Sequence, residues 1–155
     1  LLGNCDSGVI ACQGGNMAGW SLYLDSDSRP TYVYNWFGHE FTTLAGEPLC
    51  AGEQQICIEY AHDGGFAAGG ELTLSVNGSC LARDRLERTV PVIFSMSGET
   101  FDVGRDTGSP VGKYPHDFPF SGTIHGVTLE RLTEPSQAVK EQERKGAFKA
   151  GLSAQ

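Results

Sequence analysis

The chain has little positive charge and no long apolar run. Its 11 Lys and Arg are outnumbered by 19 Asp and Glu, so the net charge is −8 over 155 residues. Proteins that bind DNA or RNA need clustered cations to displace counterions from phosphates, and the one basic cluster here, residues 83–88, is interrupted by acidic side chains. No apolar stretch approaches the roughly 20 residues of a membrane-spanning helix. We therefore expect neither a nucleic-acid nor a membrane partner.

Zinc-knuckle and thioredoxin-type motifs are also missing. The five cysteines, Cys5, Cys12, Cys50, Cys57 and Cys80, include no Cys-x-x-Cys pair, the spacing that such sites use. An odd number of cysteines spread over a chain of this length favours reduced, cytosolic thiols over a disulfide framework. A single disulfide, between Cys5 and Cys12 or between Cys50 and Cys57, stays open on spacing alone.

The first residues lack the basic and apolar regions of a secretory signal peptide. We therefore expect a cytoplasmic location. The chain does not begin with Met, which leaves open that it is a piece of a longer protein.

The usual signatures of hydrolytic enzymes are missing as well. Acyl transfer needs a nucleophile, a base and an orienting acid in one pocket, but no Gly-x-Ser-x-Gly elbow occurs, and the histidines are scattered at positions 39, 62, 116 and 125. Glucanases use carboxylates spaced along one strand, and no Glu-x-Asp-x-Glu or Glu-x-Asp-x-x-Glu run is found. We expect this chain alone to have no enzyme activity.

The sequence does contain a series of short alternating segments separated by turn residues. Its 21 glycines and 7 prolines form no repeat, so they indicate turns between strands. The clearest segment is residues 71–76, which is followed by Asn77-Gly78, a dipeptide typical of a type I′ hairpin turn. Strands are predicted at residues 8–13, 20–24, 31–37, 40–44, 54–60, 71–76, 80–85, 90–94, 101–105 and 124–132. This pattern predicts an all-β fold, a two-sheet antiparallel sandwich over residues 1–132.

The composition changes after residue 132. Residues 137–152 are rich in Ala, Lys, Glu, Gln and Arg, which are good helix formers, and Ser136 can serve as the N-cap. We therefore predict a C-terminal helical tail over residues 133–155. Its apolar stripe is thin, so the helix would need a surface on which to dock.

Seven segments of the chain stand out together. They are GVIACQGG (8–15), GWSLYL (19–24), Tyr34-Asn35, Asp63-Gly-Gly65 with Gly69-Gly70, RLERTVP (85–91), ETFDVGRDTGSPV (99–111) and FPFSGTI (118–124). In this order they resemble the C-terminal domain of bacterial-type arylsulfatases, and residues 141–155 are similar to the helical end of those proteins. The resemblance covers nearly the whole chain. It implies a concanavalin A-like or laminin-G-like jelly-roll sandwich with a C-terminal helix, which follows a large α/β catalytic domain.

The resemblance also identifies what this chain lacks. Such sulfatases hydrolyse sulfuric esters with a formylglycine made from the Cys or Ser of a Cys/Ser-x-Pro-x-Arg motif, beside a divalent metal. The nearest segment here is Cys80-Leu-Ala-Arg-Asp84, with Ala82 in place of Pro and Asp84 in place of Arg. We therefore expect a non-catalytic accessory sandwich that packs against a sulfatase catalytic domain or joins a second copy of itself.

Two sets of residues are candidates for binding. Tyr32, Tyr34 and Trp36 share one face of a predicted strand and could stack on a sugar, which makes a free-standing carbohydrate-binding module the alternative function. Aromatic residues at this spacing are more often part of a core. Asp102 and Asp106 could offer oxygen ligands to calcium, the one cofactor considered, or they could cap turns by accepting backbone hydrogen bonds.

Overall fold

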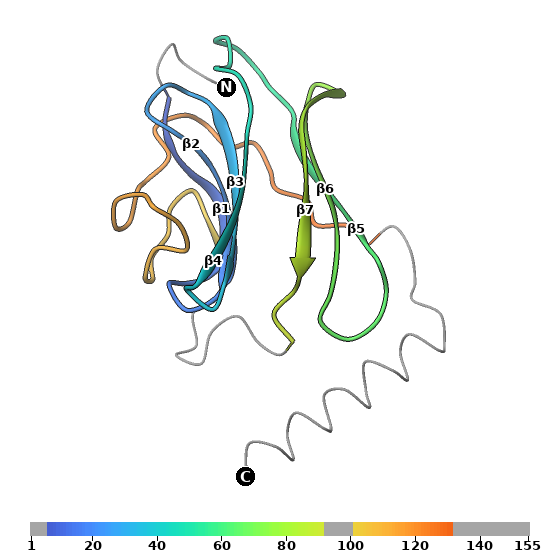
Figure 1. Cartoon of the computed structure of the whole chain (residues 1–155). Coiled ribbons are helices and arrows are strands. Elements are labelled where there is room, and N and C mark those ends of the chain that lie inside the picture. The colour runs from blue at the N-terminus through green and yellow to red at the C-terminus, as the bar shows by residue number, and fades with distance from the viewer. Residues whose placement is uncertain (1–5, 92–100, 132–155) are drawn as a thin grey trace.

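The computed structural model describes residues 6–91 and 101–131, and these form an all-β fold (Figure 1). The strands are β1 (Gly8–Gly14), β2 (Gly19–Leu24), β3 (Pro30–Trp36), β4 (Glu40–Ala45), β5 (Ile56–His62), β6 (Ala68–Val76), β7 (Ser79–Arg88) and β8 (Phe101–Val103). No helix occurs within the two described ranges.

The strands form two antiparallel sheets that lie face to face (Figure 1). One sheet has five strands in the order β4-β3-β2-β1-β8, and the other has three in the order β5-β6-β7. Strands β1 to β4 and β5 to β7 follow one another as hairpins, whereas β8 returns from far along the chain to pair with β1. The prediction of an antiparallel two-sheet sandwich is thus confirmed.

The main core lies between the two sheets. Its fully buried members are no more than 7% exposed and come from both layers, namely Tyr32, Tyr34 and Leu44 of the larger sheet and Leu72, Leu74 and Leu86 of the smaller one. Full burial of one leucine side chain contributes about 1.5–3 kcal/mol. The three leucines of β6 and β7 therefore hold the smaller sheet against the larger.

The hairpin predicted at Asn77-Gly78 is confirmed. Both residues have positive φ, +50° at Asn77 and +78° at Gly78, and Val76 pairs directly with Ser79 across the turn. The side chain of Asn77 also helps to fix the end of β5, because its Oδ1 accepts a 2.9 Å hydrogen bond from the backbone N–H of Gln55.

A loop over residues 104–120 covers the outer face of the five-stranded sheet (Figure 1). Backbone hydrogen bonds fix it to β1: Val9 N–H donates to Phe118 O at 2.9 Å, and Gly104 N–H donates to Ile10 O at 3.0 Å. Beneath the loop lies a second apolar cluster, made of Val9, Cys12, Val33 and Val111 with Tyr23, Tyr114 and Phe118 packed against it. The larger sheet therefore packs against the smaller sheet on part of its inner face and against this loop on its outer face.

The last predicted strand, at residues 124–132, is wrong for residues 124–131, which form no strand. Val127 and Leu129 do alternate with polar residues, as a strand would require. A strand also needs a neighbour to accept and donate its backbone hydrogen bonds, and no described strand pairs with this segment. Val90 and Pro91 are likewise not in a strand, while residues 92–94 and the predicted helical tail lie outside the described residues.

Four of the cysteines are free thiols in the structure. Cys12 is buried, whereas Cys50, Cys57 and Cys80 are exposed. Neither of the disulfides that the spacing left open is formed, because each would need one of these thiols.

Candidate functional site

Three potential ligand residues meet on the outer face of the five-stranded sheet. The backbone register places Cys12 of β1 directly opposite Asp102 of β8 and opposite Ser21 of β2. Side chains of directly opposed residues emerge on the same face of a sheet. Ser21, Cys12 and Asp102 therefore form a row across β2, β1 and β8. Asp106 joins them from the loop that follows β8. The Cys12 thiol and one carboxylate oxygen from each of Asp102 and Asp106 lie within 4.8 Å of one another.

Asp106 reaches this position because the chain turns sharply after β8. Gly104 has φ +82°, a conformation that suits glycine, and the Asp106 side chain is then only 1% exposed. Its Oδ2 accepts hydrogen bonds from the Tyr114 hydroxyl at 2.6 Å and from Val111 N–H at 3.3 Å. The buried carboxylate thereby holds the second half of the loop against the sheet.

Asp102 acts in a similar way on the first half of the loop. Its Oδ2 accepts hydrogen bonds from both the backbone N–H and the hydroxyl of Thr107, each at 2.7 Å. This is the turn-capping role that the sequence offered as one of two possibilities. A carboxylate offers about four lone-pair sites, so the capping role and a ligand role are compatible.

The surroundings of the cluster raise the pKa of both its thiol and its phenol, which favours their protonated forms. Burial and the nearby charges of Asp106 and Asp102 raise the pKa of the Cys12 thiol to about 12. Burial, together with the hydrogen bond that it donates to Asp106, raises the pKa of the Tyr114 hydroxyl above its ordinary value. At neutral pH the cluster therefore contains a thiol, a phenol and two aspartate side chains. Within the described ranges, no Lys or Arg forms an ion pair with either aspartate.

Ser21 is a member of this cluster that sequence reasoning missed. Its side chain is fully buried, and its hydroxyl has no hydrogen-bond partner of good geometry. Its polar contact with the Tyr114 hydroxyl falls outside good hydrogen-bond geometry, and this contact lowers the pKa of Tyr114 against the larger effect of burial. The signal that could have found it is the pairing of 19–24 with 8–13, since the register sets Ser21 beside Cys12.

The aromatic residues proposed for sugar stacking lie against other parts of this chain. Tyr32 and Tyr34 are 7% and 5% exposed within the main core. The Tyr34 hydroxyl accepts a 2.8 Å hydrogen bond from the N–H of Val90. The ring of Trp36 is covered by the guanidinium carbon of Arg88, 3.6 Å from its centroid. The stacking hypothesis therefore gains no support from this conformation.

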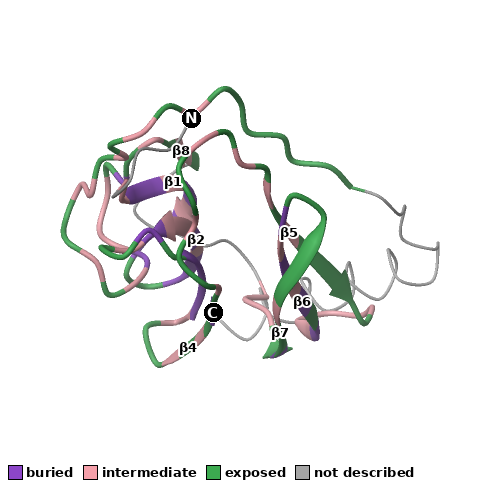
Figure 2. Ribbon diagram, turned by 90° about the horizontal axis from the view of Figure 1, so that it is seen from above, coloured by how far each residue is buried: buried purple, intermediate pink, exposed green. Residues whose placement is uncertain are grey.

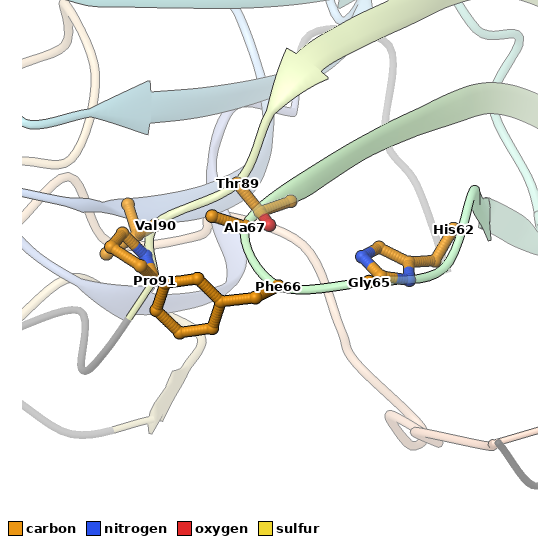
Figure 3. A pocket seen from close by; sticks show the side chains of 7 residues that line it. All are labelled: His62, Gly65, Phe66, Ala67, Thr89, Val90 and Pro91. Carbon is orange, nitrogen blue, oxygen red and sulfur yellow. The ribbon is translucent and has the colours of Figure 1, made fainter. Parts of the chain in front are cut away.

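A shallow hollow of about 270 Å³ lies where β7 ends, lined by His62, Gly65, Phe66, Ala67, Thr89, Val90 and Pro91 (Figure 3). Two of its polar groups are engaged within the chain. The Thr89 hydroxyl donates to Ala68 O at 2.9 Å, and Nδ1 of His62 accepts from Gly64 N–H at 3.1 Å. The residues that line the hollow include no carboxylate or thiol beside His62.

Comparison of the chain with models of protein families, with curated proteins and with solved structures finds no significant match. Within residues 6–91 and 101–131, no helix is long and apolar enough to cross a membrane.

Proposed function

We propose that the chain is a non-catalytic accessory sandwich of an arylsulfatase-like protein, which packs against the catalytic domain that hydrolyses sulfuric esters. The sequence basis is the ordered resemblance of seven segments. The observation that carries the proposal is that the five-stranded sheet extends past the three-stranded one and leaves part of its inner face uncovered.

The uncovered surface is formed by β8. Phe101 and Val103 pair with Gln13 and Ala11, which in turn pair with Trp20 and Leu22 on the core side of β2. Both β8 side chains therefore face the same side as the main core. They are nevertheless 36% and 47% exposed, because the smaller sheet does not reach this edge. An apolar edge of this kind favours burial against a partner.

A second apolar element adds to the surface available to a partner. In residues 124–131, Val127 is 36% and Leu129 is 68% exposed. Figure 2 shows most of the stretch leading to residue 131 as exposed chain outside both sheets. An extended segment with alternating apolar side chains and free backbone groups can add a strand to the sheet of another domain.

The proposal of a role without catalysis rests on the sequence, which contains no formylglycine motif. Cys80, in the segment nearest to the formylglycine motif, is an exposed residue of the β7 hairpin arm. The lining of the hollow at the end of β7 includes His62 and Thr89 but no carboxylate or thiol. The same proposal includes two further features. They are the jelly-roll connectivity and a helical tail over residues 133–155 that docks on the partner.

Co-expression tests the proposal. The coding sequence upstream of this chain is predicted to contain a Cys/Ser-x-Pro-x-Arg motif, and the domain that it encodes should co-purify with this chain when the two are produced as separate polypeptides. Val103→Asp should reduce the recovered complex at least about tenfold, because a charge would replace an apolar contact. Leu81→Asp is the matched control, since Leu81 is 37% exposed but lies on β7.

Three results would contradict the proposal. They are the absence of the upstream motif, equal loss of complex with both variants, or turnover of nitrocatechol sulfate by this chain alone. Saturable binding of sulfated sugars at millimolar concentration or below would instead favour the carbohydrate-binding alternative.

A further inference from the structure

The cluster brings the thiol of Cys12 together with the carboxylates of Asp102 and Asp106, which lie far from it in the sequence. Zinc lies about 2.3 Å from sulfur and 2.0–2.2 Å from oxygen ligands, so the ligand atoms around one ion lie about 4 Å or less from one another. In this structure the three donor atoms already lie within 4.8 Å of one another. Coordination of a common ion would require these distances to shorten.

The buried carboxylate of the cluster also lacks a positive charge to balance it among the described residues. A buried ionised carboxylate needs an opposite charge or a metal, yet Asp106 is 1% exposed and its partners, Tyr114 and Val111 N–H, are neutral. The closest candidate cation in sequence, Arg105, pairs with Asp117 at 3.4 Å instead. A divalent ion would supply the positive charge that the described residues do not.

Ser21 supplies an independent observation. A buried hydroxyl without a hydrogen bond is unfavourable, and the Ser21 hydroxyl is such a group. It emerges from β2 beside Cys12, on the same face of the sheet, and lies near the Tyr114 hydroxyl. Its oxygen thus lies beside the cluster with no hydrogen bond of good geometry there, as expected of a group that a bound ligand would complete.

We infer that this cluster is a binding site for a divalent transition-metal ion of the zinc type, with Cys12, Asp102 and Asp106 as ligands and the Ser21 hydroxyl beside the remaining position. Sulfur and few oxygens favour zinc over calcium, which takes six to eight oxygen ligands. Coordination forms a metal–sulfur bond and releases the thiol proton to solvent, with no change of oxidation state. The site would tie β1, β8 and the covering loop together, and it stands independently of the proposed sulfatase partnership.

Cobalt titration of the reduced, EDTA-treated chain tests the site, since Co²⁺ reports sulfur ligation by a near-ultraviolet charge-transfer band. The wild-type chain should show this band, and added Zn²⁺ should remove it. Cys12→Ser should abolish the band, and Asp102→Asn should weaken Co²⁺ binding at least about tenfold. Cys57→Ser is the matched control, because Cys57 is an exposed thiol of β5, and it should leave the band unchanged.

A second measurement covers variants that fold poorly. Zn²⁺ should raise the melting temperature of the wild-type chain and of Cys57→Ser, since an ion that binds only the folded state stabilises it. Far-ultraviolet circular dichroism establishes that each variant is folded before titration. The inference is overturned if the wild-type chain gives no band and no Zn²⁺-dependent rise, or if the band survives Cys12→Ser and disappears with Cys57→Ser.

Discussion

The hydroxyl of Tyr114 donates a 2.6 Å hydrogen bond to Oδ2 of the buried Asp106. The two residues come from opposite parts of the loop that covers the outer face of the larger sheet, and the same oxygen of Asp106 accepts a further bond from Val111 N–H. This contact explains why an aspartate in a glycine-rich segment is buried. It fixes the shape of the segment that carries much of the resemblance to arylsulfatases.

Tyr114→Phe should destabilise the fold by about 2 kcal/mol, because it removes a hydrogen bond to a buried charged group. Urea unfolding measures the change. Tyr60→Phe is the control, since Tyr60 is 39% exposed and substitutions at such positions usually change stability by no more than about 0.5 kcal/mol. Equal losses in the two variants would show that the Tyr114–Asp106 bond contributes nothing specific.

The buried thiol of Cys12 should make the fold sensitive to alkali. The folded state holds the thiol proton more tightly, with a pKa of about 12 against an ordinary value of 9.0. Between these values the unfolded chain binds fewer protons, so the free energy of unfolding should fall as the pH rises, by at most about 1.4 kcal/mol per pH unit from this group.

The effect of the thiol can be separated from that of the buried tyrosines by comparison with Cys12→Ala. With EDTA present, urea unfolding at pH 8 and pH 10.5 should show a smaller alkaline loss in this variant than in the wild type. Identical losses in both proteins would mean that Cys12 does not titrate in this range.

Asn35→Asp should be severely destabilising. The Asn35 amide nitrogen donates to the carbonyl oxygens of Gly15, Asn16 and Val111 at 3.0–3.2 Å, and the side chain is fully buried. A carboxylate there would face three oxygens with no proton to share, and an uncompensated buried charge costs about 3–5 kcal/mol. Asn16→Asp makes the same chemical change at an exposed position. A loss of less than 1 kcal/mol at Asn35, judged from thermal unfolding, would contradict this account.

The type I′ turn at Asn77-Gly78 can be tested by replacing its glycine, with a glycine outside the turn as the control. Gly78→Ala should destabilise the β6–β7 hairpin by about 1–2 kcal/mol, because φ at Gly78 is +78° and a side chain disfavours that conformation. Gly126→Ala should have little effect, since a Cβ at that position meets no atom within 4 Å. Urea unfolding compares the two, and a larger loss at Gly126 would reverse the interpretation.

Most of the strands could be predicted from the sequence because their signals are local. The alternation of Leu72, Leu74 and Val76 and the adjacent Asn77-Gly78 describe a hairpin without any reference to the rest of the chain. The same reasoning failed at residues 124–131, where the alternation is present but no described strand offers a partner. Side-chain periodicity indicates which residues would share a face of a strand. Whether the strand forms depends on a neighbouring strand with which it can pair, and the periodicity does not show one.

The site could be predicted only in part, because it depends on long-range register. Asp102 and Asp106 stood out as a pair in one glycine-rich segment. The places of Cys12 and Ser21 beside them follow from the pairing of β1 with β8 and β2, which no local pattern contains. Tyr32 and Tyr34 were ambiguous for a related reason, since alternation does not distinguish an aromatic face that meets a second sheet from one that meets solvent.

Hydrogen–deuterium exchange of this chain, alone and in complex with the catalytic domain that we propose as its partner, tests the central claim most directly. The account predicts that the partner slows exchange at residues 101–103 and 124–131, where apolar side chains are exposed, and leaves the β4 and β7 edges unchanged. Protection confined to β4 and β7, or no protection anywhere in the chain, would contradict it.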